Sequence, residues 1–398
     1  MRGRRATCPR TSRRPGGGLT GVYPSAFSES WTGHRYLLPE NMPSDILTTR
    51  LVRVTPLCLN SITYISLCWA TGGSAVQGQL VGKRFVVREF LGAGAEAQVY
   101  RAIERETDHE VALKFQFARG HETVRTYRGD GENLAHAAHL GMLLADVRGV
   151  PEVFWHGRHG ERHCLATEFV DGISVEEAIC KARPVRCVPT LAATLGQICE
   201  TLSAMHDRGL VHCDLKPENL LIGARNDLLH ILDLGSAEFI GRPFRGGTSG
   251  YAAPENLDQL GPVSASADVF SLGCVLIEMT TMKLPYGGQE GRPEAGLAPV
   301  SAADAALIPT RLRDLALRMV AYDPDHRPRD ARAVLTELAP LLPRLGDPRP
   351  VKAWDPDPTA RYRFCVSAEP PRAVRRARRI TSCPACAARI PRSRRPRA

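Results

Sequence analysis

The sequence has no hydrophobic run long enough to cross a bilayer as a helix. Its most apolar stretch, LCLNSITYISLCWA at residues 57–70, falls short of the roughly 20 residues that a spanning helix needs. This stretch also follows a long polar segment, which is not the arrangement of an ordinary secretory signal peptide. The sequence therefore predicts no membrane span and a cytoplasmic location.

A disulfide framework is also missing. The twelve cysteines are scattered along the chain, as expected for thiols in a reducing compartment. Cys383 and Cys386 have the spacing of half a zinc site, but no second CxxC or CxxH follows. A metal there would need Cys365 or a second chain, and plain thiols are the alternative.

Acidic residues are absent from both ends of the chain. Residues 370–398 contain ten arginines and no acid, and residues 1–28 contain six arginines and no acid, so the basic net charge of +10 belongs to the ends. Solvated, disordered ends are one interpretation of this pattern. An acidic partner protein or a nucleic acid bound by the arginine-rich tail is the other.

The chain divides into three parts. Residues 1–78 lack periodicity and indicate a disordered leader, or an artefact of an early start codon. Residues 79–343 carry regular patterns, and residues 344–398 form a proline- and arginine-rich basic tail. Within the middle part, residues 79–168 show short β-rich runs and one helix at 131–147. Residues 169–343 are mostly helical, with a long amphipathic helix at 190–209 and a nearly all-apolar helix at 266–281. We expect an α+β fold with two lobes.

Two stretches in the first lobe favour anion binding. GAGAEAQV at 92–99 places Gly92 and Gly94 between two predicted strands, where backbone N–H groups can approach a phosphate. A glycine hairpin without a ligand is the alternative. Lys114 of VALK follows on a strand among apolar residues, where an anion would offset its charge.

The stretch HCDLKPENLL at 212–221 combines three chemical groups. The carboxylate of Asp214 can accept a proton from a hydroxyl, Lys216 can neutralise charge, and the amide of Asn219 can bind a metal. In ILDLG, Asp233 ends an apolar strand and suits a hard cation such as Mg²⁺. Phosphoryl transfer requires this set of groups.

Six stretches in order resemble eukaryotic-like serine/threonine protein kinases: GAGAEAQV, VALK, HCDLKPENLL, DLG, GTSGYAAPE and DVFSLG. The resemblance covers about residues 80–343, and the composition is typical of a bacterial member. It implies a bilobal protein kinase-like fold with an antiparallel N-terminal sheet. It also implies ATP and Mg²⁺ as cofactors, with Mn²⁺ as an alternative metal, and protein serine or threonine hydroxyls as acceptors.

The resemblance assigns a role to each matched residue. Asp214 would be the catalytic base, Lys216 would steady the γ-phosphate, and Asn219 and Asp233 would be metal ligands. The implied nucleotide-binding residues are Leu91, Gly92, Gly94, Val99, Ala112, Lys114, Glu132, Glu168, Val170 and Leu221.

Several of these roles are specific. Lys114 would contact the α- and β-phosphates, and backbone groups of Glu168 and Val170 would meet the adenine edge. The faces of the adenine would lie against Val99, Ala112 and Leu221. Two structural roles are also implied: Glu255 would pair with Arg327, and Asp268 would brace the catalytic loop.

The chain departs from the family at four positions. Leu234 replaces a phenylalanine, and Ala97 replaces the third loop glycine. The glutamate that should pair with Lys114 is Glu132 or, failing that, Glu122. Cys213 stands where most members have an arginine that gathers a phosphorylated activation loop.

The activation loop itself lacks a phosphoacceptor in its middle, AEFIGRPFRGG at 237–247. Since both sides of the usual switch are missing, we expect activity without activation-loop phosphorylation. Plain drift at a packing position and a redox-sensing thiol are the alternatives for Cys213. A pseudokinase scaffold that binds nucleotide and recruits a partner through its basic tail is the alternative function. A small-molecule phosphotransferase is disfavoured, because that class lacks the APE element and its arginine partner.

Overall fold

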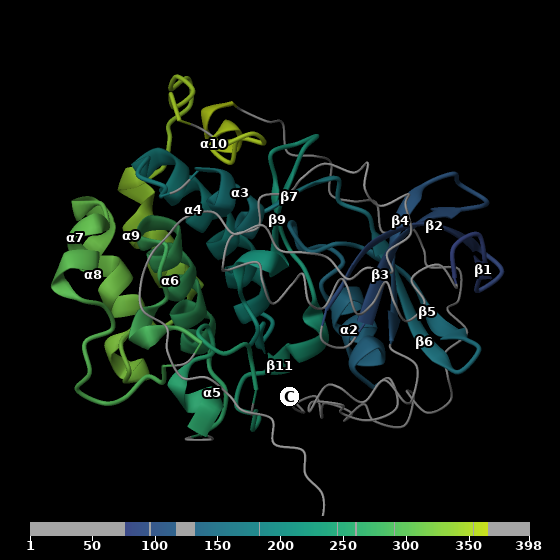
Figure 1. Cartoon of the computed structure of the whole chain (residues 1–398), viewed down its shortest axis with the longest axis horizontal. Helices are drawn as coiled ribbons and strands as arrows, with labels where there is room; N and C mark the ends of the chain where they lie inside the picture. The colour runs from purple at the N-terminus through teal and green to yellow at the C-terminus, as the bar shows by residue number, and fades with distance from the viewer. Residues whose placement is uncertain are drawn as a thin grey trace, which may run out of the picture. The chain divides into compact units, whose positions relative to one another are not determined.

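The computed structural model describes residues 76–94, 97–116, 132–182, 184–244, 246–258, 261–289, 291–352 and 354–364, all within one unit of the chain (Figure 1). Most of the predicted leader, the CxxC pair and the arginine-rich residues 370–398 therefore lie outside the described residues. Within the described ranges, no helix is both long and apolar enough to cross a membrane.

The N-terminal lobe is an antiparallel sheet with strand order β1-β2-β3-β4-β6-β5. Its strands are β1 (Leu80–Val81), β2 (Phe85–Ala93), β3 (Ala97–Glu104), β4 (Glu110–Gln116), β5 (Val153–His159) and β6 (Arg162–Glu168). Side chains alternate between the two faces of each strand, and Tyr100, Leu113 and Phe115 fill the core on one face. This core fixes the register that places Val99 opposite Lys114.

Helix α2 (Glu132–Leu143) packs against β5, β6 and the 3₁₀ turn η4 (Leu234–Ser236). The close approach depends on Gly141, since a Cβ there would come within 2.4 Å of a methyl group of Val153. Leu134 and Leu140 of α2 share one buried cluster with Leu234. The helix therefore joins the first lobe to the start of the activation segment.

The C-terminal lobe is mostly helical. Its helices are α3 (Val175–Ala182), α4 (Val188–His206), α5 (Pro254–Asp258), α6 (Ala265–Thr281), α7 (Ala302–Leu307), α8 (Thr310–Met319), α9 (Ala331–Leu338) and α10 (Ala360–Arg363). Its other 3₁₀ turns are η3 (Pro217–Asn219), η5 (Pro285–Gly287), η6 (Pro324–His326) and η7 (Ala339–Leu341). Helix α6 is buried along nearly its whole length, as its apolar sequence predicts.

Short strands carry the loops of the candidate site, and of these the sequence analysis predicted only the apolar strand that leads to Asp233. They are β7 (Gly172–Ser174), β8 (Leu210–Val211), β9 (Leu220–Gly223), β10 (Leu229–Ile231) and β11 (Glu238–Phe239), paired as β10-β9-β7 and β11-β8. Asp214 follows β8, and Asp233 follows β10. Two small sheets thereby fix the two predicted acids.

The chain after Pro343 also packs against the C-terminal lobe. We call residues 346–352 and 354–364 the C-terminal strap. Trp354 is buried, the N–H of Asp357 donates to Asp227 at 2.7 Å, and Tyr362 donates to Glu200 at 2.9 Å. Gln197 of α4 donates to the carbonyl of Pro358 at 2.9 Å. The strap thus joins α4 to the turn between β9 and β10.

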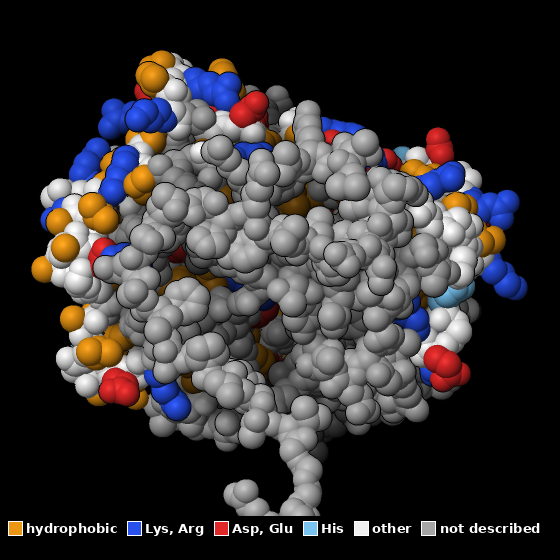
Figure 2. All heavy atoms as spheres, in the orientation of Figure 1, with side chains coloured by type: hydrophobic (Ala, Val, Ile, Leu, Met, Phe, Trp, Pro, Cys, Tyr) orange, Lys and Arg blue, Asp and Glu red, His pale blue; other side chains and the backbone are white. Residues whose placement is uncertain are grey.

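Basic side chains gather at the upper left of Figure 2, over the region that Figure 1 labels α9 and α10. Three strap arginines are paired with acids: Arg361 lies 3.0 Å from Glu200, and Arg349 and Arg363 lie 3.4 Å and 2.7 Å from Asp357. Part of the basic charge of the strap is therefore neutralised within the folded chain.

The predicted α+β fold is confirmed, with an antiparallel sheet and one helix in the first lobe and mainly helices in the second. The predicted helix at 190–209 is observed at 188–206, and the one at 266–281 is observed at 265–281. The predicted bounds of the domain, 79–343, remain a prediction.

Candidate active site

The catalytic loop is held from below by a buried acid, Asp268 of α6. Its carboxylate accepts from the backbone N–H groups of His212 at 2.8 Å and Cys213 at 2.9 Å, and lies 3.0 Å from His206. Burial alone would raise the pKa of Asp268, but the neighbouring donors, His206 first, hold it below its ordinary value. The predicted bracing role of Asp268 is confirmed by these bonds.

Cys213 adopts a left-handed backbone conformation, with φ of 66°, and its thiol is buried. Burial raises the pKa of this thiol, and the negative charge of Asp268 raises it further, so the group is uncharged at neutral pH. The Sγ atom lies 3.6 Å from the carbonyl of Val211. Cys213 is a packed, neutral side chain in this structure.

Four polar side chains converge beside this loop. Asp214 accepts from Thr248 Oγ1 at 2.6 Å and from the N–H of Thr248 at 2.9 Å. Lys216 donates to Thr248 Oγ1 at 2.8 Å and lies 3.4 Å from the Asp214 carboxylate. Asn219 donates to the carbonyl of Asp214 at 2.8 Å. These bonds fix the orientation of the predicted base, cation and amide.

Asp233 and Lys114 form one of the links between the two lobes. Lys114 Nζ lies 2.8 Å from Asp233 Oδ1, although 119 residues separate them in the sequence. Desolvation alone would raise the pKa of Asp233, but the charge of Lys114 and the N–H of Gly235 outweigh it and lower the pKa to about 2. Asp233 is therefore ionised at neutral pH, as a metal ligand must be.

The glycine loop leaves open space. A Cβ added at Gly92 or Gly94 would have no described atom within 4 Å. The N–H of Gly94 donates to the carbonyl of Ala97 at 2.9 Å, which closes the hairpin, and Leu91 is 44% exposed. The loop backbone is therefore accessible to a ligand, although its contact with phosphate stays a prediction.

Three predicted adenine-contacting residues are only half-buried. Val99, Ala112 and Leu221 are partly exposed, whereas their strand neighbours Tyr100 and Ile222 are fully buried. Apolar side chains left half-exposed between buried neighbours offer surface that a flat aromatic ring can cover. Their role in adenine binding remains a prediction.

Where β6 leads from the first lobe into the second, the backbone N–H of Glu168 is already bonded to the carbonyl of Glu152 at 2.8 Å. Its side chain accepts from the N–H of Glu152 at 3.3 Å. A ligand that meets Glu168 through the backbone would therefore use its carbonyl oxygen. Val170 lies in the irregular segment that follows, and its role stays a prediction.

Glu132 is the first residue of α2, as its sequence context predicts for a helix start. Its side chain, and the whole of Glu122, lie outside the described residues. The partner of Lys114 among these glutamates therefore stays a prediction, and the described partner of Lys114 is Asp233.

The segment that follows the activation loop is anchored by buried pairs. Arg327 makes two bonds to Glu255, at 2.8 and 2.9 Å, which confirms the predicted bridge. Tyr251 donates to Glu278 of α6 at 2.6 Å, a pair that the sequence analysis missed. An acid placed ten residues after Asp268 on an otherwise apolar helix was the available signal.

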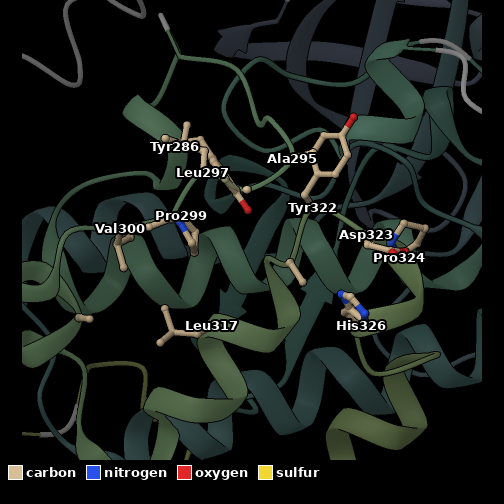
Figure 3. A pocket seen from close by; sticks show the side chains of 14 residues that line it. Tyr286, Ala295, Leu297, Pro299, Val300, Leu317, Tyr322, Asp323, Pro324 and His326 are labelled. Atoms are coloured by element: carbon tan, nitrogen blue, oxygen red, sulfur yellow. The ribbon is translucent and has the colours of Figure 1, made fainter.

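A hollow of about 720 Å³ lies elsewhere in the C-terminal lobe (Figure 3). Its lining includes Leu297, Pro299, Leu317 and Tyr322, and none of the predicted site residues. Among the described residues, no group of three or more His, Cys, Asp or Glu side chains is arranged to hold a metal ion. The metal ligands predicted from the sequence are one acid and one amide, Asp233 and Asn219, so they form no such group.

Residues 85–337 match the family described as Protein kinase domain. The serine/threonine-protein kinase pkn2 of Myxococcus xanthus is 28% identical over 302 residues, which cover 69% of this chain and 35% of the relative. PknL of Mycobacterium tuberculosis is 27% identical over 286 residues, 69% of each chain. PrkC of Bacillus subtilis is 24% identical over 265 residues, 63% of this chain and 39% of the relative.

The chain thus spans well under half the length of pkn2 and PrkC. The family match nevertheless covers more than half of this chain, and it includes every residue to which the sequence assigned a chemical role. The bilobal structure agrees with the match, and the predicted resemblance is confirmed. This chain belongs to the protein kinase domain family, and its relatives include bacterial serine/threonine kinases.

Proposed function

We propose that this protein is an ATP-dependent kinase that transfers the γ-phosphoryl group to serine or threonine hydroxyls of protein substrates. The convergence of Asp214, Lys216 and Asn219 with Thr248 is the observation that carries the proposal. The names of the bacterial relatives support serine and threonine as acceptors.

The residues fit Mg²⁺–ATP as the cofactor. Open backbone at Gly92 and Gly94 leaves room for phosphates, and the ionised Asp233 with the Asn219 amide offers oxygen ligands for a hard cation. Mn²⁺ accepts the same ligands. The bound metal and nucleotide would supply the phosphoryl group and neutralise its charge.

The chain's own groups would orient the acceptor and move its proton. The carboxylate of Asp214 would accept the proton of the acceptor hydroxyl, since the hydroxyl and the N–H of Thr248 hold that carboxylate in place. Lys216, already donating to Thr248, would place a positive charge beside the transferring group. Lys114 would exchange its contact with Asp233 for the phosphates.

A transfer assay with γ-labelled ATP and a generic protein acceptor tests this function. We expect the wild-type chain to be active with Mg²⁺ or Mn²⁺, and Asp214→Asn to lose about 10²- to 10⁴-fold in rate. Asp314→Asn is the matched control, because Asp314 is 87% exposed and remote in sequence from the catalytic residues. If wild type and Asp214→Asn are equally inert, the kinase proposal fails and the scaffold alternative is favoured.

We further propose that activity does not need activation-loop phosphorylation. The uncharged Cys213 thiol cannot attract a phosphate, and the segment 237–247 contains no hydroxyl side chain. Phosphatase treatment of the purified protein should leave the initial rate unchanged. A large fall in rate after that treatment would contradict the proposal.

The proposed kinase function also implies the partners and the cellular location of this protein. The acceptors would be proteins, and a cytoplasmic location is consistent with the free thiols of the described cysteines. An acidic partner or nucleic acid at the arginine-rich tail stays a prediction, because residues 370–398 lie outside the described chain.

A further inference from the structure

Helix α2 makes a polar contact with the activation segment, the stretch between Asp233 and Glu255. No sequence motif predicts this contact. Nε2 of His136 lies 2.7 Å from the carbonyl oxygen of Ala237, a residue 101 positions away. A carbonyl oxygen can only accept, so Nε2 carries the hydrogen and donates it. Ala237 follows η4 directly, and η4 begins one residue after Asp233.

The packing around this bond brings helix α2 close to the segment, and the bond then fixes the orientation of the helix. Gly141 brings α2 close to β5, and a Cβ at Gly141 would lie 3.9 Å from a methyl group of Leu234. Apolar contacts with Leu234 hold the helix near the segment, but they do not set its rotation. The His136 bond supplies a fixed point on the helix, one turn after its start.

The next part of the segment is built by backbone pairing within the C-terminal lobe. Strand β11 pairs with β8, the N–H of Ile240 donates to Gly209 at 2.8 Å, and the N–H of Gly241 donates to Val263 at 3.0 Å. The thiol of Cys213 is uncharged, so it cannot form an ion pair with this segment. Among the described residues, the polar contacts between the first lobe and the segment include Lys114–Asp233 and His136–Ala237.

We propose that His136 is a positioning residue for phosphoryl transfer. By donating to Ala237, it would fix α2 against the segment and hold Asp233 in its metal-binding place without a phosphate on the activation loop. This inference rests on the proposed kinase function. It adds that the hydrogen bond from His136 to Ala237 keeps the activation segment in place.

Three variants of the full chain test the inference. His136→Gln keeps an N–H donor at similar reach, His136→Met keeps the length and removes the donor, and His139→Met repeats the change at an exposed position of the same helix. We expect His136→Met to lower kcat about 3- to 10-fold with unchanged KM for the protein acceptor. His136→Gln should recover at least half of the wild-type kcat, and His139→Met should match the wild type.

Amide hydrogen exchange of residues 236–241 gives a readout that needs no catalysis. Faster exchange there in His136→Met, but not in His136→Gln or His139→Met, is expected at equal melting temperatures. Equal kcat and equal exchange in His136→Met and the wild type would overturn the inference. So would equal loss in the Met and Gln variants. A wild-type chain without transferase activity would refute the proposed function, while the exchange data would still test the His136 bond.

Discussion

At the scale of single residues, the site depends on polar groups whose orientation is set by their neighbours. His212 illustrates this: its Nε2 lies 2.9 Å from the carbonyl of Leu232, and its Nδ1 lies 3.3 Å from the N–H of Asp214. Nε2 therefore donates to the carbonyl, and Nδ1 accepts from the N–H. The ring thereby connects the residues that precede Asp233 with Asp214, the proposed base.

Cys213 gives a direct test of the environment of the catalytic loop. Because the thiolate is the reactive form and burial raises the pKa of this thiol, Cys213 should resist alkylation in the folded protein. Among the described cysteines, Cys180 and Cys187, which are only half-buried, should react before Cys213 with iodoacetamide at pH 8. Mass spectrometry of peptides after timed labelling measures the order. Labelling of Cys213 as fast as Cys187 would contradict its position in the structure.

Glu278 should make stability depend on pH. Burial, aided by the negative charges of Glu218 and Glu176, raises its pKa to about 7, although the bond from Tyr251 opposes the rise. The folded protein therefore keeps this proton between about pH 4.5 and 7, where the unfolded chain has released it. The resulting stability is complete below the ordinary pKa of 4.5 and is lost as pH rises through 7.

Glu278→Gln keeps an acceptor for Tyr251 and removes the titration. Between pH 5 and 8, the free energy of unfolding of the wild type should fall by about 2 kcal/mol more than that of the variant. Urea unfolding at both pH values measures the difference. Identical pH dependence in the two proteins would show that Glu278 does not titrate in this range.

At the scale of elements, the strap extends the fold beyond the residues that match the family. Its buried pair, Arg363 and Asp357, lies 2.7 Å apart, and each side chain is 6% exposed. Asp357 also caps the turn at Asp227, whose φ of 53° is unusual for a residue with a side chain. The strap therefore stabilises the hairpin β9–β10, which leads into Asp233.

Two truncations separate the strap from the tail. A chain that stops after Leu345 loses Trp354 and the pair Arg363–Asp357, and its free energy of unfolding should fall by at least about 3 kcal/mol. A chain that stops after Phe364 keeps the strap and should melt with the wild type. Thermal unfolding followed by circular dichroism measures both. Equal melting temperatures for the two truncations would show that the strap does not stabilise the fold.

Helices and strands were predicted correctly where they are long enough to show a periodic pattern of apolar residues. Helix α6 was predicted within one residue at its start, because its sequence is mainly apolar over more than four turns. Strands of two to four residues, such as β8 and β9, were missed because they are too short for any period to show. The sequence analysis assigned the strap to the basic tail, because its prolines and arginines resemble a linker. Its packing depends on contacts with residues far away in the sequence, which composition does not indicate.

At the scale of the whole molecule, the order of the motifs was enough to predict which distant residues meet. Lys114 and Asp233 were assigned to one nucleotide site, and they lie in contact. The contact between His136 and Ala237 could not be predicted, because a single histidine on a helix has no distinguishing pattern. Such contacts depend on how the two lobes pack, which a motif does not encode.

The central claim is that Lys114, Asp214, Asn219 and Asp233 surround one metal-bound nucleotide. Crystals grown with Mn²⁺ and a non-hydrolysable ATP analogue test it through the anomalous signal of the metal. We predict a metal ion about 2.0 to 2.3 Å from oxygens of Asp233 and Asn219, with Lys114 moved from Asp233 to the phosphates. A nucleotide bound elsewhere, or a Lys114–Asp233 pair that stays closed at saturating nucleotide, would contradict the account.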